Sequence, residues 1–122
     1  MAPKKPRDPA SFLPLTPRVF HVLLALAEGP LHGYAVIQEV KAQTAGVIVL
    51  RTGTLYMLVQ RLVDQDLIDE SDDRPHPDED DERRRYYTLT TTGRAVLQAE
   101  SRRLQQVLGT VRRKNVLGVP RT

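Results

Sequence analysis

The stretch RTGTLYMLVQRLVDQD, residues 51–66, decides the fold of this chain. Apolar side chains recur in it at the spacing of one helix face, at Leu55, Leu58, Val59 and Leu62. The opposite face carries Met57, Gln60 and Asp64, flanked by Tyr56 and Arg61. Thr52 and Thr54 stand at the N-terminal end, where a hydroxyl caps a helix or meets a phosphate. The stretch therefore predicts a helix that docks on a core and presents a hydrogen-bonding face outward.

Two further helices are predicted before this stretch. Thr16 is the expected N-cap of the first and Pro17 suits its first turn, so this helix runs from Arg18 to Glu28. It is apolar nearly all round, and we expect it at the centre of the core or of a dimer contact. Gly29-Pro30 ends it. The second helix is expected from Gly33 to Thr44.

Individual residues around the second helix have expected places. His32 is expected to cap or pack at the helix start, and His21 to lie at the edge of the core. Tyr34 is expected in the core, on one apolar stripe with Ile37 and Val40. The β-branched run at residues 47–50 predicts one short strand before the central helix.

A hairpin is predicted after the central helix. Leu67 to Ser71 and Arg84 to Leu89 have the composition of strands, and the polar residues 72–83 between them cannot be core. Helix, helix, short strand, helix and hairpin is the order of a winged helix-turn-helix domain. The expected fold class is mainly α with a small β-hairpin.

A last helix is predicted from Thr90 to about Lys114. Apolar residues at roughly heptad spacing make an imperfect seam on it, and the helix is longer than the small domain needs. We expect this seam to form a dimer through Leu97, Leu104, Leu108 and Val111. The expected organisation is a disordered basic arm (1–14), the winged-helix domain (15–90), the dimerisation helix (91–114) and a flexible tail (115–122).

Charge is strongly segregated along the chain. The net charge is +3, yet residues 69–82 hold nine acidic residues and one arginine. The rest of the chain keeps 17 basic and 6 acidic residues. A basic body with one acidic loop is typical of a protein that binds a polyanion.

Composition argues against an enzyme. At 122 residues the chain is expected to form one domain, and the absence of Cys excludes disulfides, thiolate metal sites and a cysteine nucleophile. The three histidines lack metal-ligand spacing, and there is no Gly-rich phosphate loop. We expect no catalytic residue, metal or cofactor. The longest apolar run, residues 19–27, is too short to cross a membrane, and we expect a cytoplasmic protein.

Three motifs together resemble the PadR-like transcriptional regulators. They are LHGY at residues 31–34, GTLY at residues 53–56 and YYTLTTTG at residues 86–93. The resemblance covers about residues 15–112 and implies a dimeric winged-helix repressor that binds double-stranded DNA, of the short subgroup with a single C-terminal helix. The chain departs from the pattern at Met57, where the family often has Pro, and in its acidic hairpin tip.

The resemblance turns the polar face of the central helix into a DNA-reading surface. A recognition helix enters the major groove with its N-terminal half, so the expected readers are Thr52, Thr54, Tyr56, Met57, Gln60 and Arg61. Gln38, Lys41 and Arg51 are expected to hold phosphates. At the wing base, strand alternation lets either Arg84 alone, or Arg83 with Arg85, face the DNA.

Two alternatives remain at this point. The acidic hairpin tip suits a winged-helix module that docks a basic protein partner and binds DNA weakly, instead of a sequence-specific regulator. The family also implies a small aromatic or multidrug-type effector at the dimer centre. Phe12, Phe20 and the first-helix leucines are its candidate lining, and they serve equally well as core.

Overall fold

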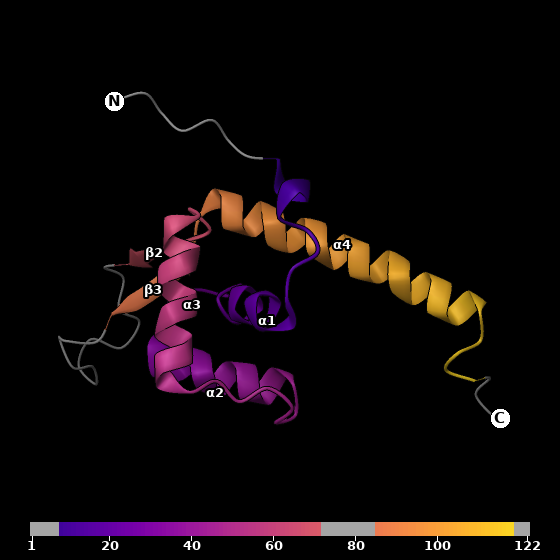
Figure 1. Cartoon of the computed structure of the whole chain (residues 1–122), viewed down its shortest axis with the longest axis horizontal. Helices are drawn as coiled ribbons and strands as arrows, with labels where there is room; N and C mark the ends of the chain where they lie inside the picture. Colours follow the sequence, from indigo (N-terminus) through magenta and orange to yellow (C-terminus); the bar gives the residue numbers. More distant parts are fainter. Residues whose placement is uncertain (1–7, 72–84, 119–122) are drawn as a thin grey trace.

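The computed structural model describes residues 8–71 and 85–118 (Figure 1). In chain order its elements are η1 (Pro9–Phe12), α1 (Pro17–Ala25), β1 (Leu31–His32), α2 (Gly33–Gln43), α3 (Thr52–Asp64), β2 (Ile68–Ser71), β3 (Tyr86–Leu89) and α4 (Thr91–Arg113). None of the helices in these ranges is long and apolar enough to cross a membrane. The winged helix-turn-helix arrangement predicted from the sequence is confirmed.

The strands form one antiparallel sheet in the order β1-β3-β2. β2 pairs with β3 from Ile68 opposite Leu89 to Ser71 opposite Tyr86, which confirms the predicted hairpin strands. The predicted strand at residues 47–50 is wrong, because the third strand is instead β1, before α2.

The end of α2 explains why residues 47–50 stay irregular. Ala45 and Gly46 both adopt positive φ, which turns the chain sharply away from the helix. The Thr44 hydroxyl then accepts a hydrogen bond from the Ile48 amide at 3.0 Å and donates one to the Val40 carbonyl at 2.9 Å. Local side-chain bonds therefore take the backbone groups that a strand would have used.

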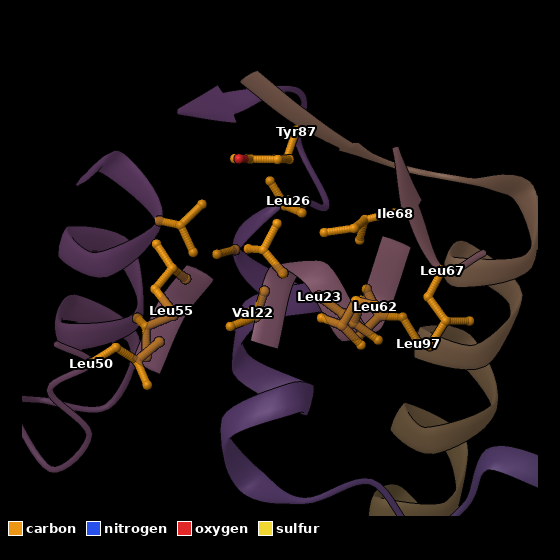
Figure 2. Close-up of a cluster of buried hydrophobic side chains, with 14 of the residues drawn as sticks. Val22, Leu23, Leu26, Leu50, Leu55, Leu62, Leu67, Ile68, Tyr87 and Leu97 are labelled. Carbon is orange, nitrogen blue, oxygen red and sulfur yellow. The ribbon is translucent and has the colours of Figure 1, made fainter. Parts of the chain in front are cut away.

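α1 lies at the centre of the core. Thr16 caps it as predicted, accepting a hydrogen bond from the Val19 amide at 3.3 Å. In Figure 2, Leu23 of α1 lies beside Leu62 of α3 and Leu97 of α4, and all three are buried. The core therefore joins helices that are far apart in the sequence, and it fixes α3 with its apolar face inward.

The start of α4 is held by the turn that follows α3. Asp66 has φ of 62°, and the Leu67 amide returns to the Leu62 carbonyl at 2.9 Å. Thr90 caps α4 by accepting from the Gly93 amide at 2.8 Å, and its own amide donates to the Leu67 carbonyl at 3.1 Å. α4 then extends well past the other elements in Figure 1.

The segment before α1 is more ordered than expected. Residues 9–12 form η1, which packs on α4, and Phe12 and Leu13 pack against the core. The expected disordered arm of residues 1–14 is therefore wrong for the part that the structure describes, from residue 8 onward. Apolar burial offsets the entropy of ordering this segment.

A buried carboxylate fixes the same segment. Glu100 of α4 is 1% exposed and accepts a hydrogen bond from the Leu15 amide at 2.7 Å. Arg103, one turn along the helix, donates to both carboxylate oxygens. The hydrogen bonds from Arg103, and then from the Leu15 amide, hold the pKa of Glu100 below its ordinary value against the opposing effect of burial.

Glu100→Gln is expected to lower the free energy of unfolding at pH 7 by about 1–3 kcal/mol, because it removes a charged acceptor from buried donors. A lowered folded pKa means that this stabilisation is present above the unfolded pKa and is lost as pH falls through the folded pKa. Urea unfolding should therefore give a difference from wild type that shrinks as pH falls from about 5 to 3. The exposed Glu39→Gln is the matched control. A difference that stays constant down to pH 3 would contradict the assignment.

Candidate nucleic-acid interface

α3 presents the face that the sequence predicted. Leu55, Val59 and Leu62 are buried, whereas Met57 is 74% and Tyr56 49% exposed. Gln60 and Arg61 are also exposed, and Thr54 is half-buried. The predicted readers on α3 thus lie along its outer side and N-terminal turn, which is the geometry of a helix that enters a groove.

The first turn of α3 has no side-chain cap. Arg51 occupies the N-cap position, and no side chain accepts a hydrogen bond from the first turn. Of the two roles open to Thr52 and Thr54, capping is not used in the structure, and contact with a phosphate stays a prediction. The amides of this turn and the exposed Arg51 side chain form a positive end that suits an anionic group.

Gln60 has a partner within the helix. Its amide nitrogen donates to the Asp64 carboxylate at 3.1 Å, one turn further along. This hydrogen bond lies on the surface and stabilises the helix by only about 0.2–0.5 kcal/mol. Gln60 can exchange it for a base edge at little cost, so the predicted role in reading adenine stands as a prediction.

α2 adds exposed polar groups beside α3. Gln38 and Lys41 are exposed, as their predicted role in holding phosphates needs. His32 caps the helix by accepting from the Ala35 amide at 3.1 Å, and His21 bonds to Gln43 at the edge of the core, as predicted.

The prediction that Tyr34 is a core residue is wrong, because Tyr34 is 62% exposed. The buried stripe of α2 is instead Gly33, Val36 and Val40. A glycine at the buried position lets α3 come close: a Cβ on Gly33 would lie 3.1 Å from the Tyr56 hydroxyl and 3.3 Å from a Leu55 methyl. Gly33 and Val36 therefore take the buried positions expected of Tyr34 and Ile37, and Tyr34 turns outward.

The base of the wing contributes an ion pair. Arg85, just before β3, is exposed and lies 3.3 Å from the Glu70 carboxylate of β2. Arg83, Arg84 and the acidic residues 72–82 lie outside the described residues, so the predicted contact of Arg84 stays a prediction. Sequence reasoning missed Glu70, because its place opposite Tyr87 is set by the register of the two strands, which the structure shows.

A cleft of about 650 Å³ lies between the start of α2, α3 and the strands β2 and β3. We call it the α3–sheet cleft. Its lining comprises His32, Gly33, Tyr34, Tyr56, Val59, Gln60, Val63, Glu70, Arg85 and Tyr87. Tyr87 is 4% exposed, and burial is the main cause that raises the pKa of its phenol, so this phenol stays a hydrogen-bond donor at neutral pH.

α4 carries a second exposed feature. Leu104, Val107 and Leu108 are 38%, 47% and 40% exposed, and Val111 is half-buried. Their spacing places all four on one side of the helix, and Figure 1 draws no other element against that half of α4. Val107 was missed in the sequence because the heptad reading skipped it, although the 104-107-108-111 spacing contains it.

Leu97, the first residue of the predicted dimer seam, is 6% exposed and belongs to the core (Figure 2). α1 and α3 already cover it, so its assignment to the seam is corrected. Phe12, Phe20 and Leu24 likewise pack against the core. The structure therefore uses the candidate effector lining as core. Among the described residues, no group of His, Cys, Asp and Glu could hold a metal ion.

A model of the transcriptional regulator PadR-like family matches residues 22–99. A 37.1 kDa protein in transposon TN4556 of Streptomyces fradiae is 36% identical over 93 residues, which cover 74% of this chain. The chain spans only 24% of the length of that relative. The match runs from the second half of α1 to the first turns of α4, and it includes the α3–sheet cleft.

Solved structures share the fold. A PadR-like transcriptional regulator from Bacillus cereus superimposes with a TM-score of 0.66 at 19% identity, covering 84% of this chain and 93% of that one. PadR of Bacillus subtilis in complex with operator DNA gives a TM-score of 0.57 at 20% identity, covering 70% of this chain and 46% of that one. At these identities the likeness is one of fold.

Proposed function

Because this chain belongs to the PadR-like family of transcriptional regulators, we propose that it is a repressor that binds a palindromic operator as a homodimer. Members of this family are regulators of transcription, so the chain is a DNA-binding regulator and not an enzyme. The observation that carries the finer proposal is the outer face of α3, where large polar and apolar side chains stand exposed on a helix held rigidly by its buried face.

In the proposed complex, α3 lies in the major groove. Thr52, Thr54 and Met57 approach the base edges, with the Met57 side chain against a thymine methyl group. Gln60 pairs with adenine, and Arg61 with guanine or a phosphate. Tyr56 packs against the sugar-phosphate backbone. The described fold supports this arrangement because these side chains lie together on one solvent-facing side.

Phosphate contacts set the register of the protein on DNA without reading sequence. We assign these to Gln38 and Lys41 of α2 and to Arg51 at the uncapped start of α3, with Arg84 of the wing as a further candidate. PadR of Bacillus subtilis shares the fold and binds operator DNA. That precedent supports the assignment for this chain.

The second half of the proposal is the dimer. An exposed apolar side of α4 at Leu104, Val107, Leu108 and Val111 fits a copy of the same helix, and two copies bring two α3 helices to half-sites about one helical turn apart. A small-molecule effector that releases the DNA is part of the proposal, as is a cytoplasmic location. No residue is assigned to the effector, because its expected lining is core.

Arg61→Ala is expected to weaken operator binding about tenfold to a hundredfold, because a bidentate contact to guanine contributes about 1–3 kcal/mol. Arg112→Ala, with the same loss of charge on an exposed residue near the end of α4, should change binding by less than about twofold. Gel-shift titration on an operator selected from random DNA measures both. Equal losses would contradict the assignment of α3.

The affinity of the wild-type protein for its operator should fall about a thousandfold between 50 and 200 mM salt. Absence of DNA binding at low salt would refute the proposed function itself.

A further inference from the structure

Two of the tyrosines that line the α3–sheet cleft have hydroxyls without a hydrogen-bond partner among the described residues. Tyr87 stands on β3 and is 4% exposed, yet its ring lines the cleft. Tyr56 lines it from α3, where a Cβ at Gly33 would lie 3.1 Å from its hydroxyl. A buried phenol without a hydrogen-bond partner in the described part of the chain is unusual, because desolvation of a hydroxyl costs about 1–3 kcal/mol. The Tyr87 phenol therefore lacks an acceptor among the described residues, whereas the exposed Tyr56 phenol is free to exchange water for a ligand.

Among the described residues that line the cleft, the charged groups are one cation and one anion. Arg85 and Glu70 lie 3.3 Å apart at its rim, with side chains 71% and 58% exposed. An exposed pair of this kind is worth only about 0–1 kcal/mol, so an external anion can take the guanidinium from the carboxylate. Besides Gln60 and His32, the donors on its described lining are three phenols, of Tyr34, Tyr56 and Tyr87, and the guanidinium. They all suit a ligand rich in acceptor oxygens.

We propose that the α3–sheet cleft seats one phosphate of the operator backbone, and that Glu70 competes with this phosphate for Arg85. The inference rests on the proposed DNA binding and deepens it. Tyr56 and Gln60 belong both to the cleft and to the outer face of α3, so a strand that follows α3 in the major groove passes directly over the cleft. Val59 and Val63 offer an apolar wall for the adjoining sugar.

The shape of the cleft favours a strand of DNA over a small molecule. Its rim is made by exposed side chains of Tyr34, Tyr56, Glu70 and Arg85. A drug-sized ligand in a dedicated site has about 70–90% of its surface buried, and a ligand in this open cleft would remain largely in solvent. A polymer that spans the rim needs no such enclosure, because contacts on both sides of it hold it in place.

In this arrangement Glu70 keeps the affinity of the protein for its operator below the highest value that the cleft could give. When the phosphate arrives, Arg85 exchanges a carboxylate for a phosphate, and Glu70 is left beside a second negative charge. Removing the charge of Glu70 therefore abolishes both the competition and the repulsion. Glu70 acts on DNA affinity through Arg85, and its loss should strengthen binding.

Glu70→Gln is expected to tighten operator binding about threefold to tenfold at low salt. Arg85→Gln should weaken it about tenfold and reduce the salt slope by about one. In the Arg85→Gln background most of the gain from Glu70→Gln should disappear. The control for net charge is Glu28→Gln, which changes an exposed glutamate outside the cleft and should alter binding by less than about twofold. Equal gains from Glu70→Gln in both backgrounds would overturn the competition.

Tyr87→Phe separates a role in binding from a role in folding. Because the hydroxyl has no partner among the described residues, its removal should leave the free energy of unfolding unchanged or slightly higher. Operator affinity should nevertheless fall about threefold to fivefold. Unchanged operator affinity in Tyr87→Phe would refute the phosphate site in the cleft. The proposed function is tested separately, because it requires only that the wild type binds the operator and that Arg61→Ala weakens this binding.

Operators with a single neutral methylphosphonate linkage locate the phosphate. Wild type should lose affinity at one linkage in each half-site that Arg85→Gln no longer senses. If Arg85→Gln responds to every linkage as wild type does, no phosphate occupies the cleft. A different outcome would also overturn the proposal. If no linkage is sensed through Arg85, and a small acid that binds the cleft displaces the DNA, the cleft is a site for a small ligand.

Discussion

Gly93→Ala is expected to be the most destabilising single methyl group that can be added to this chain. A Cβ at this position would lie 1.9 Å from the Leu67 carbonyl oxygen and 2.9 Å from its carbonyl carbon. Both are backbone atoms, so no side chain can rotate away. The same carbonyl accepts the Thr90 amide, and the Thr90 hydroxyl caps α4, so moving either segment breaks this junction.

Gly93→Ala is expected to lower the free energy of unfolding by at least about 3 kcal/mol, which is at the upper end of overpacking effects. This is a large part of the about 5–15 kcal/mol by which a domain of this size is stable. Urea unfolding followed by circular dichroism, at constant protein concentration, measures it. The matched control is Gly109→Ala in the same helix, which has nothing within 4 Å of its Cβ. Helix propensity predicts that this control is neutral or more stable by up to about 1 kcal/mol. A Gly93→Ala variant as stable as the control would contradict the close approach of α4 to Leu67.

The double substitution of Leu104 and Leu108 by glutamate is expected to have the second largest effect, on assembly and DNA affinity together. Both side chains lie exposed on the same side of α4. In a helix-to-helix dimer they would be buried, and two charges on each chain would have to be desolvated against two on the other, which costs several kcal/mol. We expect monomers in sedimentation equilibrium and at least about a hundredfold weaker operator binding, since each half-site must then be bound separately.

The control for this variant is Gln105→Glu with Gln106→Glu. It adds the same charge at exposed positions on the other sides of α4. It should stay dimeric and lose much less DNA affinity. A double Leu variant that remains dimeric would refute the role of α4 in assembly, while a monomeric variant that keeps full affinity would refute operator binding by a dimer.

The central helix shows how much of this fold could be predicted from the sequence. Apolar residues at 55, 59 and 62 recur at helical spacing, and in the structure they are buried while Met57 and Tyr56 are exposed. The helix caps at Thr16 and His32 were predictable for the same reason. Caps and amphipathic faces depend on residues within a turn or two of each other, so the sequence itself contains the relevant contacts.

The candidate site was predicted less completely. The sequence placed Tyr34 in the core, because tyrosine is large and largely apolar, and the structure turns it outward, where it lines the same cleft as Tyr56. Glu70 and Tyr87 were not singled out, since their meeting with α3 depends on the β2–β3 register and on the approach of α2. No spacing within one element reveals a cleft that three elements build together.

By itself the sequence determined the order of the elements and the polar face of α3, because short-range spacing and local capping fix both. Its three motifs carried the resemblance to a family of regulators. Only the tertiary structure decided that residues 31–32 and not 47–50 form the third strand, that Leu97 belongs to the core and that Gly93 must carry no side chain. Each of these depends on which distant segment lies against the residue. Leu67, 26 positions before Gly93 in the sequence, is in contact with it only in the folded chain.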